Sequence, residues 1–219
     1  MLELSVKFLL SYFVGSVMGS MVIGWFRGGV DIRTMGSGNA GGTNALRTQG
    51  WIFALGVVII DVGKGALGAG VIPGLNLPYV GTDPTLSREW LTLCCAAAAV
   101  IGHVWPMWHK FRGGKGAATL AGTLLVLSPE LLLPVLLAWA IVLTSFGYVG
   151  FATIAATITA PLFIAATRFP EDQPLFIYCV TMVLMAIFTH RSNLQRMRDG
   201  TESRQARLML FRRQREPTK

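Results

Sequence analysis

Charged residues are scarce in this 219-residue chain, making up 14% of it against about 25% in an ordinary soluble domain. Hydrophobic residues make up 53%. They lie in nearly uncharged blocks of about 15 to 25 residues, the length that crosses about 30 Å of hydrocarbon. The composition therefore argues against a water-soluble protein and predicts a polytopic membrane protein.

Cysteine is scarce as well, with three residues, Cys94, Cys95 and Cys179. All three lie inside apolar runs, so their spacing provides neither a disulfide framework nor a CxxC metal site. We expect them to be small buried side chains, and we expect the protein to need no metal ion and no cofactor.

Seven apolar segments are predicted to be helices of the membrane domain. The first contains Glu3 and Lys7 and lacks a small-residue cleavage site, so it is expected to remain as a span and not to be removed as a signal peptide. The fourth and fifth are short and separated only by Ser128-Pro129-Glu130, so they could form a hairpin that does not reach both surfaces. The segments are 3–25, 51–72, 90–105, 117–128, 131–145, 149–167 and 174–189. We therefore predict an all-α fold with about seven transmembrane helices, with residues 1–200 as a single domain and 201–219 as a basic tail.

The charges between these segments predict their orientation. Basic residues dominate 26–50, 106–116 and the stretch from 190 onward, whereas the alternate loops are mostly acidic. Because lysine and arginine collect in cytoplasmic loops, the N-terminus is expected outside and the C-terminus in the cytoplasm. The net charge of +8 thus reflects topology and does not indicate nucleic-acid binding. Residues 203–215 mix leucines with arginines, typical of an interfacial segment against anionic lipid, although a disordered tail explains the same composition.

A glycine-rich stretch, Gly36-Ser37-Gly38-Asn39-Ala40-Gly41-Gly42-Thr43-Asn44, precedes Arg47. Its glycines leave backbone amides free to face an anion, and its polar side chains add donors, which predicts a phosphate cradle. A tight turn between spans would explain the glycines but not the neighbouring amide, hydroxyl and guanidinium groups. The letters also fit a dinucleotide fingerprint, but no strand precedes them, so that interpretation is weak.

Two further loops carry polar chemistry. In the first, Lys115 is flanked by glycines at the start of the fourth span, where the positive end of a helix favours anions. A Walker loop is disfavoured because neither its first glycine nor its Ser/Thr is present. In the second, His190, Asn193 and Arg196 recur every three residues and would share one face of a continuing helix. An ordinary positive-inside lysine and a helix-capping histidine are the alternatives.

Asp61 and Lys64 lie three residues apart within the second apolar segment. Such groups can pair with each other, and ionisable residues inside a membrane are costly enough to suggest function. The sequence leaves open whether the pair is structural or catalytic.

Taken together, the motifs resemble those of the bacterial acyl-phosphate glycerol-3-phosphate acyltransferase family (PlsY). The resemblance rests on the glycine-rich loop, Asp61-Val62-Gly63-Lys64-Gly65, Gly102-His103 with the 111–119 loop, and 190–202. It implies catalytic roles for Ser37, Lys115, His190 and Asn193. It implies substrate binding by the following residues: Gly38, Asn39, Gly41, Gly42, Thr43, Asn44, Arg47, Lys64, His103, Gly113, Gly114, Gly116, Thr119 and Arg196.

The resemblance also implies the reaction, namely transfer of a fatty acyl group from acyl phosphate to the 1-hydroxyl of glycerol 3-phosphate. The expected products are lysophosphatidic acid and phosphate. The expected location is the bacterial inner membrane, with the active site on the cytoplasmic side. The partners would be the two substrates and membrane lipid, with no nucleic acid and no obligate protein partner. The His-x-x-x-x-Asp motif of the other large acyltransferase class is absent after His103, His109 and His190. A transporter of phosphorylated molecules and a lipid-binding scaffold are the rival classes; the chain shows no internal repeat typical of a transporter.

Overall fold

The structure, a computed structural model, describes residues 1–210 and contains no β-strand within them. The helices are α1 (Leu2–Gly15), α2 (Gly19–Phe26), α3 (Gly42–Gln49), α4 (Trp51–Gly70), α5 (Arg88–Val104), α6 (Ala117–Leu127), α7 (Leu132–Phe146), α8 (Val149–Thr167), α9 (Gln173–Thr189) and α10 (Arg191–Arg198). Short 3-10 turns join several of them. The predicted all-α membrane fold is confirmed.

Each of the seven predicted segments is helical, but not every helix is long enough to cross the membrane. Within residues 1–210, four helices are long and apolar enough to cross a membrane, and the number rises to six if two bent pairs each count as one span. These pairs are α1 with α2, bent by 43°, and α9 with α10, bent by 52°. Helix α6 has 11 residues, or about 16 Å of rise, which is too short to cross the hydrocarbon.

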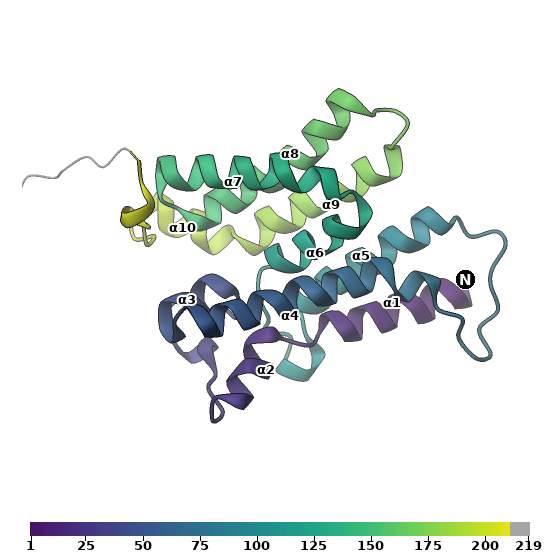
Figure 1. The fold of residues 1–219 in the computed structure, drawn as a ribbon, viewed down its shortest axis with the longest axis horizontal. Coiled ribbons are helices and arrows are strands. Elements are labelled where there is room, and N and C mark those ends of the chain that lie inside the picture. Colours follow the sequence, from purple (N-terminus) through teal and green to yellow (C-terminus); the bar gives the residue numbers. More distant parts are fainter. Residues whose placement is uncertain (211–219) are drawn as a thin grey trace, which may run out of the picture.

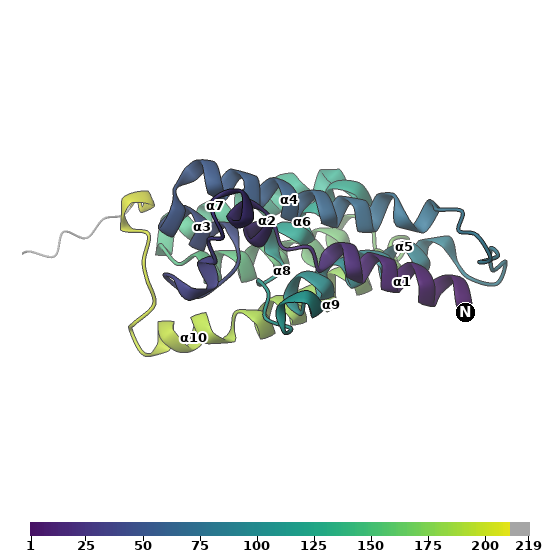
Figure 2. The same ribbon diagram turned by 90° about the horizontal axis from the view of Figure 1, so that it is seen from below.

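The helices form two layers with α6 between them (Figure 1). Helices α1, α4 and α5 make one layer, and α7, α8 and α9 make the other. The N-terminus lies at one end of the bundle, whereas α3, α10 and residues 201–210 lie at the other end in both views (Figures 1 and 2). The polar loops of the sequence motifs are thereby brought to the end opposite the N-terminus.

Glycines allow the closest helix contacts. A Cβ at Gly65 of α4 would lie 2.1 Å from the carbonyl oxygen of Thr119 in α6, and one at Gly122 of α6 would lie 2.0 Å from that of Val62. Helix α1 meets α5 in the same way at Gly15. Small residues let membrane helices approach this closely, so these positions fix where α6, and the loop before it, sit against α4.

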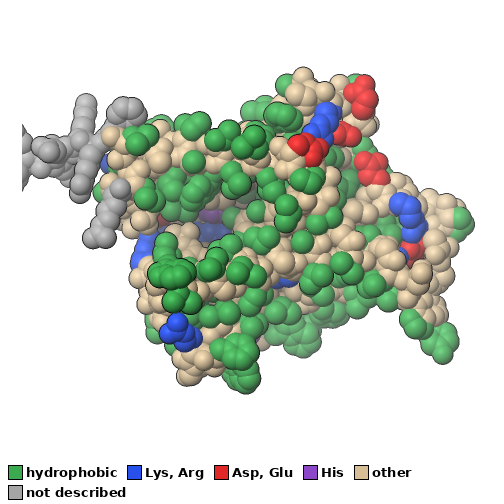
Figure 3. Space-filling view, in the orientation of Figure 1, with side chains coloured by type: hydrophobic (Ala, Val, Ile, Leu, Met, Phe, Trp, Pro, Cys, Tyr) green, Lys and Arg blue, Asp and Glu red, His purple; other side chains and the backbone are tan. Residues whose placement is uncertain are grey.

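The outer surface of the bundle is strongly apolar (Figure 3). Helix α7 shows this most clearly, with Leu133, Leu136 and Ile141 all more than half exposed. A soluble protein would not leave such a surface in water, and hydrocarbon is its natural surroundings. Basic and acidic side chains gather at the ends of the long axis in Figure 3.

Candidate active site

Lys115 occupies the loop between α5 and α6. The loop ends at Gly116, which takes a left-handed conformation (φ 88°) as the cap of α6. The Lys115 ammonium donates a hydrogen bond to Asn193 Oδ1, and the Thr189 hydroxyl donates to the Lys115 carbonyl at 3.2 Å. Burial, aided by the nearby positive charge of Arg196, lowers the pKa of Lys115 to about 8. The result is a half-buried ammonium with donor capacity to spare beside the start of a helix.

The corner between α9 and α10 supplies His190 and Asn193. The prediction that His190, Asn193 and Arg196 share one face of a continuing helix is wrong in one respect, because the helix bends by 52° at His190. Both the backbone amide and the ring Nδ1 of His190 bond to the carbonyl of Ala186, at 3.0 and 2.9 Å. Since a carbonyl only accepts, Nδ1 carries the proton and Nε2 is left as an acceptor.

Glu202 organises the same corner; it belongs to the 190–202 motif of the resemblance but was not among the predicted catalytic or binding residues. One carboxylate oxygen accepts from Asn193 Nδ2 at 2.6 Å, and the other accepts from Arg196 Nε at 2.6 Å. Asn193 and Arg196 do therefore face the same way. With its Oδ1 on Lys115 and its Nδ2 on Glu202, Asn193 is held in one orientation. No helical or strand spacing relates Glu202 to Asn193, because a turn at Gly200 (φ 70°) separates them.

Asn44 holds the glycine-rich loop together from within. It is 1% exposed, and its Nδ2 donates to the carbonyls of Ile32, Met35 and Asn39 at 2.9 to 3.0 Å. Its Oδ1 accepts from the backbone amide of Ser37 at 2.9 Å. The predicted role of Asn44 in substrate binding is thus at most indirect, because its amide is committed to shaping the loop.

The rest of the loop presents polar groups to the surroundings. Ser37, Gly38, Thr43 and Arg47 are exposed, while Asn39, Gly41 and Gly42 are half-buried. Gly36 and Gly38 have φ values of 57° and 71°, which favour glycine. Helix α3 begins at Gly42 and carries Arg47, whose Nη2 donates to the Ser203 hydroxyl at 3.3 Å.

His103, Asp61 and Lys64 form a cluster buried between helices. Lys64 Nζ lies 2.9 Å from Asp61 Oδ1, which confirms that the pair forms, and it also donates to the Val17 carbonyl at 2.7 Å. Asp61 Oδ1 lies 3.5 Å from His103 Nδ1 and accepts from the Gly19 amide at 3.2 Å. The cluster ties α4 to α5 and to the break between α1 and α2, which favours the structural interpretation of the Asp61–Lys64 pair.

Three predicted binding residues, Gly113, Gly114 and Thr119, pack against this cluster or against α4. A Cβ at Gly114 would lie 2.1 Å from His103 Nε2. Only glycine at this position therefore lets the loop backbone pack directly against the His103 ring. Gly113 is equally tight, because a Cβ there would lie 2.0 Å from the His103 carbonyl. The Thr119 hydroxyl is fully buried and has no hydrogen-bond partner in the described part of the chain. His103, Gly113, Gly114 and Thr119 thus set the position of the Lys115 loop.

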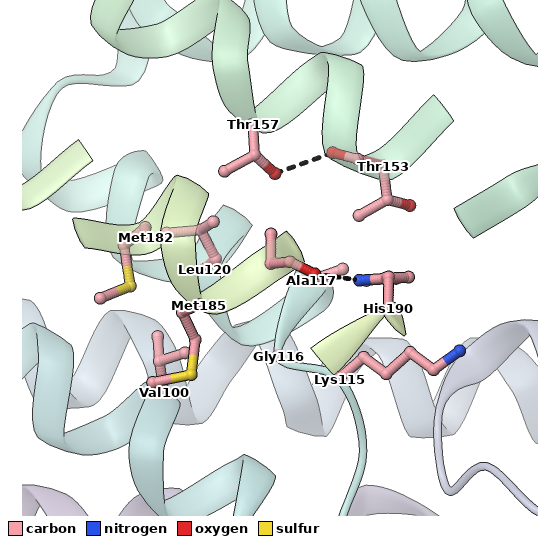
Figure 4. Close-up of a pocket in the computed structure, with 11 residues that line it drawn as sticks. Val100, Lys115, Gly116, Ala117, Leu120, Thr153, Thr157, Met182, Met185 and His190 are labelled. Atoms are coloured by element: carbon pink, nitrogen blue, oxygen red, sulfur yellow. Dashed lines mark hydrogen bonds between the residues drawn. The ribbon is translucent and has the colours of Figure 1, made fainter. Parts of the chain in front are cut away.

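A narrow cavity leads away from Lys115 and His190 (Figure 4). Its volume is about 10 Å³, roughly the space for one water molecule. Met182, Met185 and Val100 gather at one side in the close-up, whereas the Lys115 ammonium extends to the opposite side. Figure 3 shows basic and histidine side chains at the floor of a hollow near the end that carries α3 and α10. The site therefore joins a polar mouth to an apolar interior.

The family model described as glycerol-3-phosphate acyltransferase matches residues 5–200. The chain belongs to the glycerol-3-phosphate acyltransferase family. It is 38% identical over 215 residues to the glycerol-3-phosphate acyltransferase of Salinibacter ruber, covering 93% of each chain. It is 35% identical to that of Chlorobaculum tepidum, covering 90% of this chain and 94% of the relative.

Solved structures agree with this family assignment. The crystal structure of PlsY, an integral membrane glycerol 3-phosphate acyltransferase, in its glycerol 3-phosphate form matches with a TM-score of 0.77 and 30% identity. The lysophosphatidic acid form matches with a TM-score of 0.76 and the same identity. Both matches cover 92% of this chain and 94% of the other. The chain is therefore an integral membrane acyltransferase of the PlsY type.

Proposed function

We propose that this enzyme transfers a fatty acyl group from acyl phosphate to the 1-hydroxyl of glycerol 3-phosphate, releasing lysophosphatidic acid and inorganic phosphate. One observation carries the proposal: Lys115, whose ammonium bonds to Asn193, and His190 line one end of a mostly apolar cavity inside a membrane bundle. An acyl phosphate has the same division into a charged head and an apolar tail. The names of the relatives, and the glycerol 3-phosphate and lysophosphatidic acid forms of PlsY, support the acceptor and the product.

Two fixed cations are proposed to bind the two phosphate groups. Lys115 is proposed to hold the phosphate of the donor, since its ammonium is half-buried and uses one hydrogen bond on Asn193. Arg47 is exposed and is bonded only by the weak 3.3 Å contact to Ser203 among the described residues. Its guanidinium can leave that hydroxyl and take the phosphate of glycerol 3-phosphate in a bidentate fashion. The glycine-rich loop is proposed to add hydrogen-bond donors around the two phosphate groups, from Ser37, Gly38, Asn39, Gly41, Gly42 and Thr43.

The chemistry requires little from any single side chain. The 1-hydroxyl oxygen of glycerol 3-phosphate attacks the carbonyl carbon of acyl phosphate, the carbonyl carbon–oxygen bond to phosphate breaks, and phosphate leaves. Lys115 and the loop donors stabilise the negative charge on the oxyanion and on the departing phosphate. The single proton of the hydroxyl passes to an oxygen of the departing phosphate. Nε2 of His190, the unprotonated ring nitrogen, can accept a hydrogen bond from the hydroxyl and assist this transfer. Asn193 keeps Lys115 aimed at the phosphate, and Arg196 keeps Glu202 on Asn193.

The acyl chain is proposed to occupy the cavity beyond Lys115. At about 10 Å³ the cavity is far too small for a fatty chain, so occupancy requires its lining to move. Met182 and Met185 line it, and methionine has flexible, unbranched side chains suited to such repacking. We propose that these two methionines open the groove when the donor enters from the lipid.

The proposed location is the bacterial inner membrane, with the site facing the cytoplasm. The loops that carry the site residues are the basic ones, and basic loops of membrane proteins collect on the cytoplasmic side. Cysteines introduced at Ser37 and in the C-terminal tail should be protected from an impermeant thiol reagent in intact cells. A cysteine at Thr82 should be labelled. Labelling of the first two would reverse the proposed orientation.

The function is tested with purified protein, synthetic acyl phosphate and glycerol 3-phosphate. We expect lysophosphatidic acid and inorganic phosphate to form in equal amounts. Sealed vesicles address the rival class: uptake of glycerol 3-phosphate without any acylated product would favour a transporter and contradict the proposal. The matched control is Lys115→Ala in the same preparation, which should form neither product at a comparable rate.

A further inference from the structure

The C-terminal strap, defined here as residues 202–210, is docked onto the bundle. Gln205 N donates to the Gly147 carbonyl at 2.8 Å, and Leu210 N donates to the Thr144 carbonyl at 3.0 Å. Arg204 Nε donates to the Phe146 carbonyl at 3.2 Å. The strap is thus fastened to the turn between α7 and α8, at the end of the bundle that carries α3 and α10 (Figures 1 and 2).

The beginning of the strap reaches residues of the site. Glu202 accepts from Asn193, the partner of Lys115, and Ser203 accepts from Arg47. One short segment therefore touches α3 through Arg47 and α10 through Asn193 and Arg196. Binding or release of the strap should therefore change the orientation of Arg47 and, through Asn193, of Lys115.

The end of the strap exposes two large apolar side chains. Leu208 is 52% exposed and Leu210 is 75% exposed. They follow Arg204, and the sequence continues with Phe211, Arg212, Arg213 and Arg215. The seat is the turn after α7, which is the least buried of the four long apolar spans in the described part of the chain and therefore the one expected to face lipid most. In sequence, this mixture of arginine and apolar residues matches anionic headgroups and acyl chains at a membrane interface.

We propose that the C-terminal strap docks on anionic phospholipid and that this docking holds Glu202 and Ser203 against the site. The inference deepens the proposed function, on which its kinetic part rests, by adding regulation by membrane charge. Leu208 and Leu210 insert into the interface, the arginines bind headgroup phosphates, and the strap keeps the seat seen in the structure. Anionic membranes then favour the ordered arrangement of Asn193, Lys115 and Arg47.

The direction of the expected effect excludes a simple surface-charge explanation. Both proposed substrates are anions, so a negative membrane lowers their concentration near the site. A higher kcat/KM in anionic membranes cannot come from substrate accumulation. It has to come from the protein, and the strap is the basic, apolar segment that touches the site.

Docking is measured with an environment-sensitive fluorophore on Leu210→Cys, in nanodiscs of phosphatidylcholine alone or with about three parts in ten of phosphatidylglycerol. The control places the fluorophore on Asp199→Cys, an exposed position of the neighbouring turn, and the unsubstituted chain measures labelling of the native cysteines. We expect a blue shift at Leu210→Cys only with phosphatidylglycerol, reversed at about 1 M salt, where the Debye length is about 3 Å. A shift that appears in pure phosphatidylcholine and grows with protein concentration would indicate a second copy as the partner and overturn the proposal.

Coupling is measured as kcat/KM for glycerol 3-phosphate in the same nanodiscs. We expect at least about a threefold increase with phosphatidylglycerol for the unsubstituted chain. Leu208→Ser/Leu210→Ser and Arg212→Gln/Arg213→Gln should each lose this increase but keep the rate measured in phosphatidylcholine. Lys110→Gln/Arg198→Gln removes two exposed cations elsewhere and should keep the increase. Equal rates in both nanodiscs for the unsubstituted chain would overturn the inference and leave the acyltransferase proposal intact, whereas no turnover in either would overturn the acyltransferase proposal instead.

Discussion

Replacement of Lys115 perturbs the proposed site most directly. Lys115→Ala removes the half-buried ammonium and leaves Asn193 Oδ1 without its donor. Loss of one preorganised donor to a developing negative charge typically costs about 3 to 4 kcal/mol, or about 10² to 10³ in rate. We therefore expect kcat to fall by that factor, while the helices, which Lys115 does not pack between, remain folded.

The pH dependence gives an independent check on the same residue. With a pKa of about 8 in the free enzyme, Lys115 is protonated below pH 8 and loses its charge as the pH rises through that value. The proposed role needs the charged form, so kcat/KM should be full near pH 7 and fall by about tenfold for each pH unit well above 8. Lys115→Arg keeps the charge throughout this range and should abolish that fall at whatever residual rate it retains.

The assay is initial-rate phosphate release from acyl phosphate between pH 6.5 and 10, with thermal melting in detergent to confirm folding. Arg198→Ala is the control, because Arg198 is exposed on α10 and should leave both rate and profile unchanged. Near-normal turnover in Lys115→Ala would refute the assignment of Lys115 to the donor phosphate. An alkaline limb that persists in Lys115→Arg would show that another group titrates there.

Three further substitutions test the rest of the site and its scaffold. Arg47→Ala should raise KM for glycerol 3-phosphate by about 10- to 100-fold, the value of a hydrogen bond to a charged group, and an unchanged KM in steady-state assays would place the acceptor phosphate elsewhere. Asn44→Ala leaves several loop groups unsatisfied and should cost at least about 3 kcal/mol, seen as a lower melting temperature; a melting temperature equal to that of the unsubstituted chain would contradict its role in the loop. Gly65→Ala pushes a Cβ against the Thr119 carbonyl and should destabilise the fold by about 1 to 3 kcal/mol, whereas Gly63→Ala, which meets nothing within 4 Å, should not. Equal melting temperatures for the two glycine variants would show that α4 and α6 do not pack as described.

The sequence predicted the helices well because the membrane leaves few choices. Each apolar block became helical, the first as the bent pair α1 and α2, since backbone groups in hydrocarbon have to bond within their own segment. The Asp61–Lys64 pair also followed from spacing, because residues three apart on a helix are neighbours. The placement of Lys115 before the start of α6 was likewise predictable from its flanking glycines.

Contacts in the site between residues far apart in the chain could not be predicted from the sequence, for physical reasons. The bend at His190 depends on its ring bonding to the Ala186 carbonyl, which periodicity does not encode. Glu202 and Ser203 reach the site only because the chain turns back after Gly200. Asn44 was predicted to bind substrate, whereas in the structure its side-chain amide bonds to carbonyls of its own loop. The positions of those carbonyls follow from the fold and not from sequence spacing. Residues 211–215, included in the predicted interfacial segment, lie outside the described part of the chain.

Donor specificity tests the central claim most directly. Purified enzyme is given glycerol 3-phosphate with either palmitoyl phosphate or palmitoyl-coenzyme A, without added metal, and lysophosphatidic acid is quantified. A thioester presents no phosphate at its scissile carbonyl for Lys115 and the loop amides to hold. We predict rapid product formation from the acyl phosphate and little or none from the thioester. Efficient use of palmitoyl-coenzyme A would contradict the account.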